Sequence, residues 1–114
     1  MDLNIEIIGD VVVVILPGET LEANITQQFE QDMEHLSEET IKVVFDMNQI
    51  RFIDSMGCRV LLTTHKRMQN KGGGLKLCCL TDPVFSIFNL MGFNELFSIF
   101  KTREEAVSSF ESSG

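Results

Sequence analysis

Residues 41–62 combine a mostly apolar run, a short connection and a segment with helical spacing, and this combination constrains the fold most strongly. Residues 54–57, Asp-Ser-Met-Gly, stand where the helical spacing begins. Ser55 is a favoured type of helix cap, because its hydroxyl can accept a hydrogen bond from a free amide of the first turn. The segment therefore predicts a buried strand, a loop and a helix that displays Ser55. The amides and dipole at such a helix start favour negative charge, including a phosphate.

The first part of the chain is predicted to form a hairpin and a helix. Apolar and polar residues alternate over residues 3–8, which is typical of a half-buried edge strand. A Gly-Asp turn leads to residues 11–16, which are apolar throughout and predict a strand buried on both faces. Residues 20–36 then place apolar side chains at helical steps, with Thr20 as the expected cap.

The rest of the chain continues to alternate between helix and strand. Glycines 72–74 are expected to end the second helix, and residues 75–80 form the next strand. Asp82 is the expected cap of a third helix, with a proline directly after it. Residues 96–100 predict a short last strand, and a capping-box pattern at Thr102 begins a terminal helix.

This order of elements predicts an α/β fold. Its mixed sheet would have parallel central strands with right-handed crossovers, an N-terminal antiparallel hairpin and about four helices. No internal repeat or linker divides the sequence, and 114 residues suffice for one continuous core. We expect a single domain over residues 1–114.

The charge and hydropathy of the chain exclude several classes of partner. Nine basic and seventeen acidic residues give a net charge of −8. This balance argues against binding nucleic acid or an anionic membrane, because basic patches supply most of the affinity for both. No apolar run approaches the roughly 18 to 20 residues that cross a bilayer, and the N-terminus lacks the pattern of a secretory signal. We expect a soluble, cytoplasmic protein.

The three cysteines do not indicate a metal site or a disulfide. Cys78 and Cys79 are adjacent and are expected to point to opposite faces of a strand. The two histidines lack the spacing of zinc ligands. We interpret the cysteines as small buried apolar residues and expect no metal and no cofactor. A reactive role for Cys58, in the first turn of a helix, is a second interpretation.

No group of side chains predicts an active site. The run of glycines 72–74 follows a helix and precedes a strand, which is the reverse of the order in phosphate-binding loops. Asp46 and Asp54 flank the loop before Ser55, but two acids and a serine do not make a hydrolytic triad. His65 lies on the order of 15 Å along the helix from Ser55, too far for base catalysis. A small acidic enzyme with an unrecognised site is the weakest interpretation.

The residues around Ser55 also match the pattern of a known family. The matching stretches are Val43-Val44-Phe45-Asp46, Phe52-Ile53-Asp54-Ser55-x-Gly57 and, after the second strand, Gly18, Glu19 and Asn24. With the amphipathic helix and Gly-rich turn that follow, this pattern resembles the STAS domain, and most closely the bacterial anti-sigma factor antagonists. The resemblance extends from about residue 3 to about residue 110.

The resemblance implies a function for this stretch. In anti-sigma factor antagonists, the serine that matches Ser55 is phosphorylated by an anti-sigma factor that is also a serine kinase of the GHKL ATPase type. The unphosphorylated antagonist binds that kinase and releases the sigma factor, and a serine phosphatase could reset the switch. The implied partner-binding residues are Asp54, Ser55, Met56, Gly57, Arg59 and Asn24.

The chain departs from the family pattern beside Ser55. Met56 replaces the usual small residue, and Cys58-Arg59 replaces the usual Leu-Gly. Arg59 is still expected to face solvent near Ser55, where it could pair with a phosphate or contact a partner. The alternative function is a scaffold subunit of a stressosome-like or lipid-transport assembly, in which Ser55 only caps the helix.

The third helix offers a further candidate surface. Phe85 and Leu90 fall off its expected inner face, which comprises Val84, Ile87, Phe88 and Met91. If they are exposed, Phe85 and Leu90 could extend a partner surface. Phe93 is expected to pack back onto the helix after a glycine cap.

Overall fold

The computed structural model describes residues 4–34, 36 and 39–112, apart from the side chains of residues 23–27, 34 and 112. The described residues form a five-stranded sheet with the order β1-β2-β4-β6-β7. Its strands are β1 (Asn4–Ile8), β2 (Val11–Ile15), β4 (Lys42–Asp46), β6 (Gly74–Cys78) and β7 (Ser98–Phe100). The β1–β2 pair is antiparallel and the other neighbouring pairs are parallel. The predicted mixed sheet with an N-terminal hairpin is therefore confirmed.

The described part of the chain contains five helices, where about four were expected. They are α1 (Ala23–Glu34), α2 (Ser55–Asn70), α3 (Asp82–Met91), α4 (Phe93–Leu96) and α5 (Arg103–Ser112). The additional helix is the short α4. Its last residue, Leu96, was expected to begin the last strand, which instead begins at Ser98. Gly92 separates α3 from α4 in a left-handed conformation with a φ of 75°. None of the described helices is both long enough and apolar enough to cross a membrane.

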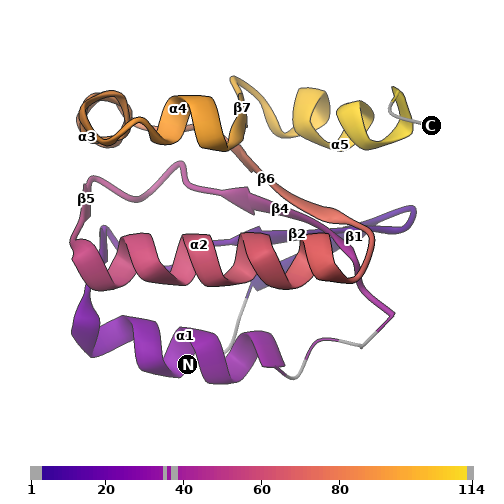
Figure 1. Cartoon of the computed structure of the whole chain (residues 1–114), viewed down its shortest axis with the longest axis horizontal. Coiled ribbons are helices and arrows are strands. Elements are labelled where there is room, and N and C mark those ends of the chain that lie inside the picture. Colours follow the sequence, from indigo (N-terminus) through magenta and orange to yellow (C-terminus); the bar gives the residue numbers. More distant parts are fainter. Residues whose placement is uncertain (1–3, 35, 37–38, 113–114) are drawn as a thin grey trace.

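Helices cover both faces of the five-stranded sheet. Figure 1 shows α1 and α2 side by side below the sheet and α5 above it. Val12 and Val14 of β2 belong to a large hydrophobic cluster that contains side chains of α1, α2, α3 and α4. Val11 and Val13 belong to a second cluster with Ala106, Val107 and Phe110 of α5. The prediction that residues 11–16 form a strand buried on both faces is confirmed for β2.

The edge strand β1 is more exposed than expected. All five of its residues are exposed, and Ile7 retains 71% of its accessible surface. The helices pack over the central strands, so this edge strand gains little cover on either face. The expectation of a half-buried strand is wrong.

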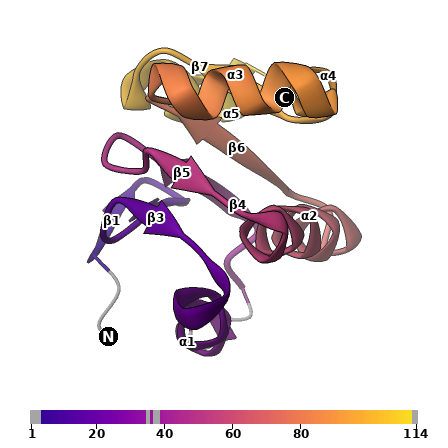
Figure 2. The same cartoon turned by 90° about the vertical axis from the view of Figure 1, so that its left-hand side faces the viewer.

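A second, two-stranded sheet was not predicted. β3 (Thr20–Leu21) pairs in parallel with β5 (Phe52–Ile53), beside the main sheet (Figure 2). The Glu19 carbonyl accepts hydrogen bonds from the amides of Arg51 at 2.6 Å and Phe52 at 3.2 Å. Thr20 therefore lies in a strand, and its expected role as the cap of α1 is wrong. This pairing holds the chain before α1 next to the chain before α2.

The helix caps follow the predictions in part. Thr81, and not Asp82, is the cap residue of α3. Its hydroxyl donates to the Ile50 carbonyl at 2.6 Å, which ties the loop between β4 and β5 to the start of α3. The expected cap of α5 is confirmed, because the Glu105 amide donates to the Thr102 hydroxyl at 3.1 Å.

The glycines after α2 form a turn, as predicted. Gly72 has a φ of 91°, in the left-handed region that favours glycine. A Cβ on Gly73 would lie 1.8 Å from the Ile41 carbonyl oxygen, so only glycine fits where the turn meets the chain entering β4.

Candidate functional site

The first turn of α2 carries most of the predicted site residues, but its cap differs from the prediction. Asp54 is the cap residue: its backbone is extended, and its carboxylate accepts a hydrogen bond from the Gly57 amide at 2.9 Å. The expectation that Ser55 caps the helix is wrong, because aspartate caps a helix as well as serine does and here stands one residue earlier. Ser55 is the first residue of α2 and is exposed. Its side chain is therefore accessible at the start of the helix.

Gly57 fixes how closely α2 approaches β3. It is buried, and a Cβ at this position would lie 2.3 Å from the Leu21 carbonyl oxygen and 2.7 Å from Cγ1 of Ile53. The close approach that glycine permits here is therefore an internal one, between the helix start and the two-stranded sheet. Leu21 also accepts a hydrogen bond from the Asp54 amide at 3.3 Å, which holds the cap residue in place.

The other predicted residues divide between the surface and the regions not described. Met56 retains 39% of its accessible surface, and Arg59 is exposed one turn after Ser55. Asp54 is partly buried. The side chain of Asn24 lies outside the described residues. Its backbone belongs to the first turn of α1, which directly follows β3. Because β3 and β5 run in parallel, the starts of α1 and α2 leave the same edge of the small sheet.

The end of α3 also lies beside this site, which the sequence did not indicate. The Cys58 thiol donates to the Met91 sulfur at 3.8 Å, so α3 ends next to the first turn of α2. Met91 retains 47% of its surface, so its expected place on the inner face of α3 is wrong. Phe52 on β5 retains 48%. Three elements thus contribute exposed apolar side chains near the start of α2: β5 contributes Phe52, α2 contributes Met56 and α3 contributes Met91.

The structure also shows where the three other apolar residues singled out on and after α3 lie. Phe85 and Leu90 are exposed, at 44% and 89% of their surface. Phe93 is buried and packs against Phe88 with ring centroids 5.3 Å apart.

Two ionisable side chains of α2 are poorly suited to chemistry. Burial, and secondarily the Asp54 carboxylate, raise the pKa of the Cys58 thiol, which lowers its thiolate fraction and argues against a reactive role. Burial lowers the pKa of His65, whose ring packs edge-on against Phe97 with centroids 5.0 Å apart. Both side chains behave as parts of the packed interior.

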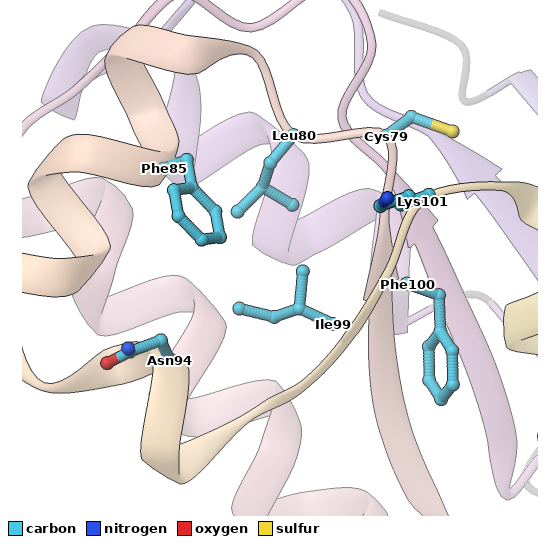
Figure 3. Close-up of a pocket in the computed structure, with 7 residues that line it drawn as sticks. All are labelled: Cys79, Leu80, Phe85, Asn94, Ile99, Phe100 and Lys101. Carbon is cyan, nitrogen blue, oxygen red and sulfur yellow. The ribbon is translucent and has the colours of Figure 1, made fainter.

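One pocket of the described structure is lined by neither of the two loop acids. Figure 3 shows this pocket of about 440 Å³, and its lining residues are Cys79, Leu80, Phe85, Asn94, Ile99, Phe100 and Lys101. Asp46 and Asp54 do not line it. Asp46 is buried and paired with Arg103, whose Nη2 donates to Oδ2 of Asp46 at 2.9 Å. The pocket thus gives no support to an enzyme that uses Asp46 and Asp54.

A mixed sheet, an exposed serine after an aspartate cap and a glycine packed on a neighbouring strand together define a domain family. The sequence model of the STAS domain matches residues 2–106, so the chain belongs to the STAS domain family.

Two proteins similar to this chain carry the same description. BtrV of Bordetella bronchiseptica, named as an anti-sigma factor antagonist, is 29% identical over 111 residues, which are 97% of this chain and 96% of that protein. A Thermotoga maritima structure of the same description superposes with a TM-score of 0.87 at 22% identity, covering 96% of this chain and 94% of that one.

The antagonist SpoIIAA has been solved in two states that both resemble this chain. Its unphosphorylated form has a TM-score of 0.81 at 18% identity and covers 96% of each chain. Its phosphorylated form, from Bacillus, has a TM-score of 0.71 at 17% identity, covering 94% of this chain and 97% of that one. At these identities the solved structures establish the fold.

Proposed function

We propose that this protein is an anti-sigma factor antagonist switched by phosphorylation of Ser55. In its unphosphorylated form it binds an anti-sigma factor that is also a serine kinase of the GHKL type, and so releases the sigma factor. Phosphorylation of Ser55 ends the complex, and a serine phosphatase restores binding. The observation that carries this proposal is the exposed Ser55 at the start of α2, in a chain whose relatives are described as anti-sigma factor antagonists.

The aspartate cap makes Ser55 a better phosphate acceptor than a capping serine would be. A capping hydroxyl takes part in the hydrogen bond that holds the first turn, so modifying it would disturb the helix. Here the carboxylate of Asp54 makes that bond to Gly57. A phosphate on Ser55 would extend from the surface, and the amides and dipole of the first turn would favour its charge.

Electrostatics at the interface account for the switch. A phosphate adds about −1.5 to −2 charges, and its favourable interaction with the helix start is worth about 1 kcal/mol, and at most about 2. Burying that dianion in an interface without new partners costs several kcal/mol. A loss of only about 3 kcal/mol weakens binding more than a hundredfold. Phosphorylation therefore acts by direct blockade and leaves the fold unchanged.

The partner surface is assigned to the exposed residues around Ser55. Met56 and Arg59 flank it on α2, and Asn24 lies at the start of α1, which leaves the same edge of the small sheet. Phe52 and Met91 add apolar area, which suits a partner with an apolar centre and a polar rim. Gly57 is assigned a shaping role, because it is buried against Leu21.

The proposal is tested by phosphorylation in vitro. The full chain is incubated with ATP and each candidate anti-sigma kinase of the same cell, and its intact mass is measured with Ser55→Ala as the control. We expect the mass of one phosphate on the wild type and none on the variant.

Two results would contradict the proposal. Phosphate on Ser55→Ala would place the switch at another residue. No phosphate with any kinase, together with unchanged partner binding by Ser55→Ala, would favour the scaffold function.

A further inference from the structure

A cluster of buried polar side chains lies at the carboxyl ends of the central strands, on the face covered by α5. Asp46 ends β4 and Cys78 ends β6, and the two residues are direct partners in the parallel ladder. Both are buried, at 2% and 0% exposure.

The backbone at Cys79 brings a second thiol to the same place. From the sequence, Cys78 and Cys79 were expected to point to opposite faces of a strand. Cys79, however, has a left-handed backbone with a φ of 63°. It consequently packs against the same cluster as Cys78, below α5, and that expectation is wrong. Figure 3 shows the Cys79 sulfur directed away from the neighbouring pocket. A left-handed backbone costs a residue with a side chain about 1 to 2 kcal/mol, and such strain is concentrated at functional sites.

We propose that Asp46, Cys78 and Cys79 bind a zinc ion. One carboxylate oxygen and the two sulfur atoms all lie within 4.8 Å of one another. Two thiolates and one carboxylate are ligands that Zn²⁺ accepts, whereas Mg²⁺ and Ca²⁺ require oxygen ligands alone. Three protein ligands leave a fourth position of the tetrahedron for water. The ion enters from the side of Cys79, which is the least buried of the three residues.

Binding is an exchange of two protons for one metal ion. The thiolate is the form of cysteine that binds a metal ion, so each ligating thiol must give up its proton. Zn²⁺ replaces the two thiol protons, two sulfur–zinc bonds form, and the protons pass to the solvent.

Arg103 can release the carboxylate of Asp46 because it has a second acidic partner. Its Nη2 atom donates to Oδ2 of Asp46 at 2.9 Å, while its Nη1 atom contacts the Glu6 carboxylate. Oδ1 of Asp46 accepts from the Asn48 amide at 3.1 Å. When Asp46 turns an oxygen to the metal, Arg103 keeps its ion pair with Glu6. The Asp46–Arg103 pair alone does not account for the left-handed backbone of Cys79.

The proposal is tested by titrating the reduced full-length protein with Cd²⁺, which gives an ultraviolet sulfur-to-metal charge-transfer band, and then displacing it with Zn²⁺. Cys79→Gly is the test variant, because glycine adopts a φ of 63° without strain and the fold is kept. Cys58→Ser is the matched control, since Cys58 is also buried but belongs to the other hydrophobic cluster, not to the one that contains Cys78. Circular dichroism verifies the fold of each variant.

We expect one Cd²⁺ per wild-type chain, displaced by one Zn²⁺. The affinity for Cd²⁺ should fall at least tenfold in Cys79→Gly and in Asp46→Asn. It should remain unchanged in Cys58→Ser. Absence of the band in the reduced wild type, or full affinity in Cys79→Gly, would overturn the proposal. A loss of binding in Cys58→Ser would place the metal at a different cysteine.

Discussion

Gly57 lies directly against the Leu21 carbonyl: a Cβ at Gly57 would approach that oxygen to 2.3 Å. This contact joins the first turn of α2 to the short strand that precedes α1. It therefore sets the position of the exposed Ser55 relative to the start of α1.

Gly57→Ala should destabilise the protein by about 1 to 3 kcal/mol, because overpacking against a backbone atom is relieved only by moving the helix. Urea unfolding of the variant and the wild type measures the difference. Ser55→Ala, two residues away and exposed, is the control and should change stability by no more than about 0.5 kcal/mol. Equal stability of Gly57→Ala and the wild type would show that α2 does not pack on β3 in this way.

Asp54→Ala should cost about 1 kcal/mol, because it removes the acceptor for the Gly57 amide. Asp54→Asn keeps a side-chain oxygen at the cap and should retain most of the stability. Thermal unfolding of both variants, with Ser55→Ala alongside, identifies the capping residue. A larger loss in Ser55→Ala than in Asp54→Ala would make Ser55 the cap.

Arg103→Met should destabilise the protein by about 3 kcal/mol, since it leaves the buried carboxylate of Asp46 without its cation. The double variant Arg103→Met with Asp46→Asn should recover part of this loss, because the unpaired charge is gone. Denaturant unfolding of the two single variants and the double variant measures the coupling energy. Strictly additive effects would mean that the two side chains do not interact.

The His65 side chain should make stability depend on pH. Burial lowers its pKa below the ordinary value of 6.5, so the unfolded chain binds the proton more readily than the folded one. This contribution is fully present above pH 6.5 and is lost as the pH falls from there through the folded-state pKa. Unfolding free energies of the wild type and His65→Gln should converge as the pH falls below about 6.5. A difference that stays constant over this range would show that His65 does not titrate abnormally.

Much of the fold follows from local patterns in the sequence. The all-apolar residues 11–16 and the glycines after α2 could be placed because each pattern has one structural solution, a doubly buried strand or a tight turn. The pairing of β3 with β5 could not be predicted, because its strands have two residues each and depend on contacts between distant segments. Thr20 consequently appeared to be a helix cap.

The start of α2 was predicted correctly from the sequence, but the residue that caps it was not. The Asp-Ser-Met-Gly stretch indicated the start of a helix, yet both Asp54 and Ser55 are good caps, and the choice depends on backbone geometry set by β5 and Leu21. The exposed position of Met91 could not be predicted, because nothing in the sequence indicates that α3 ends beside Cys58. The joint position of Cys78 and Cys79 depends on a left-handed residue other than glycine, which no sequence pattern marks.

The most direct test of the switch is the affinity of the anti-sigma kinase for two forms of this protein, unphosphorylated and phosphorylated on Ser55, measured by isothermal titration calorimetry. Backbone chemical shifts of both forms verify that the fold is the same. The blockade mechanism predicts binding at least a hundredfold weaker after phosphorylation, equivalent to about 3 kcal/mol, with shifts confined to the first turn of α2 and its neighbours. Equal affinity of the two forms, or loss of binding with shifts throughout the core, would contradict it.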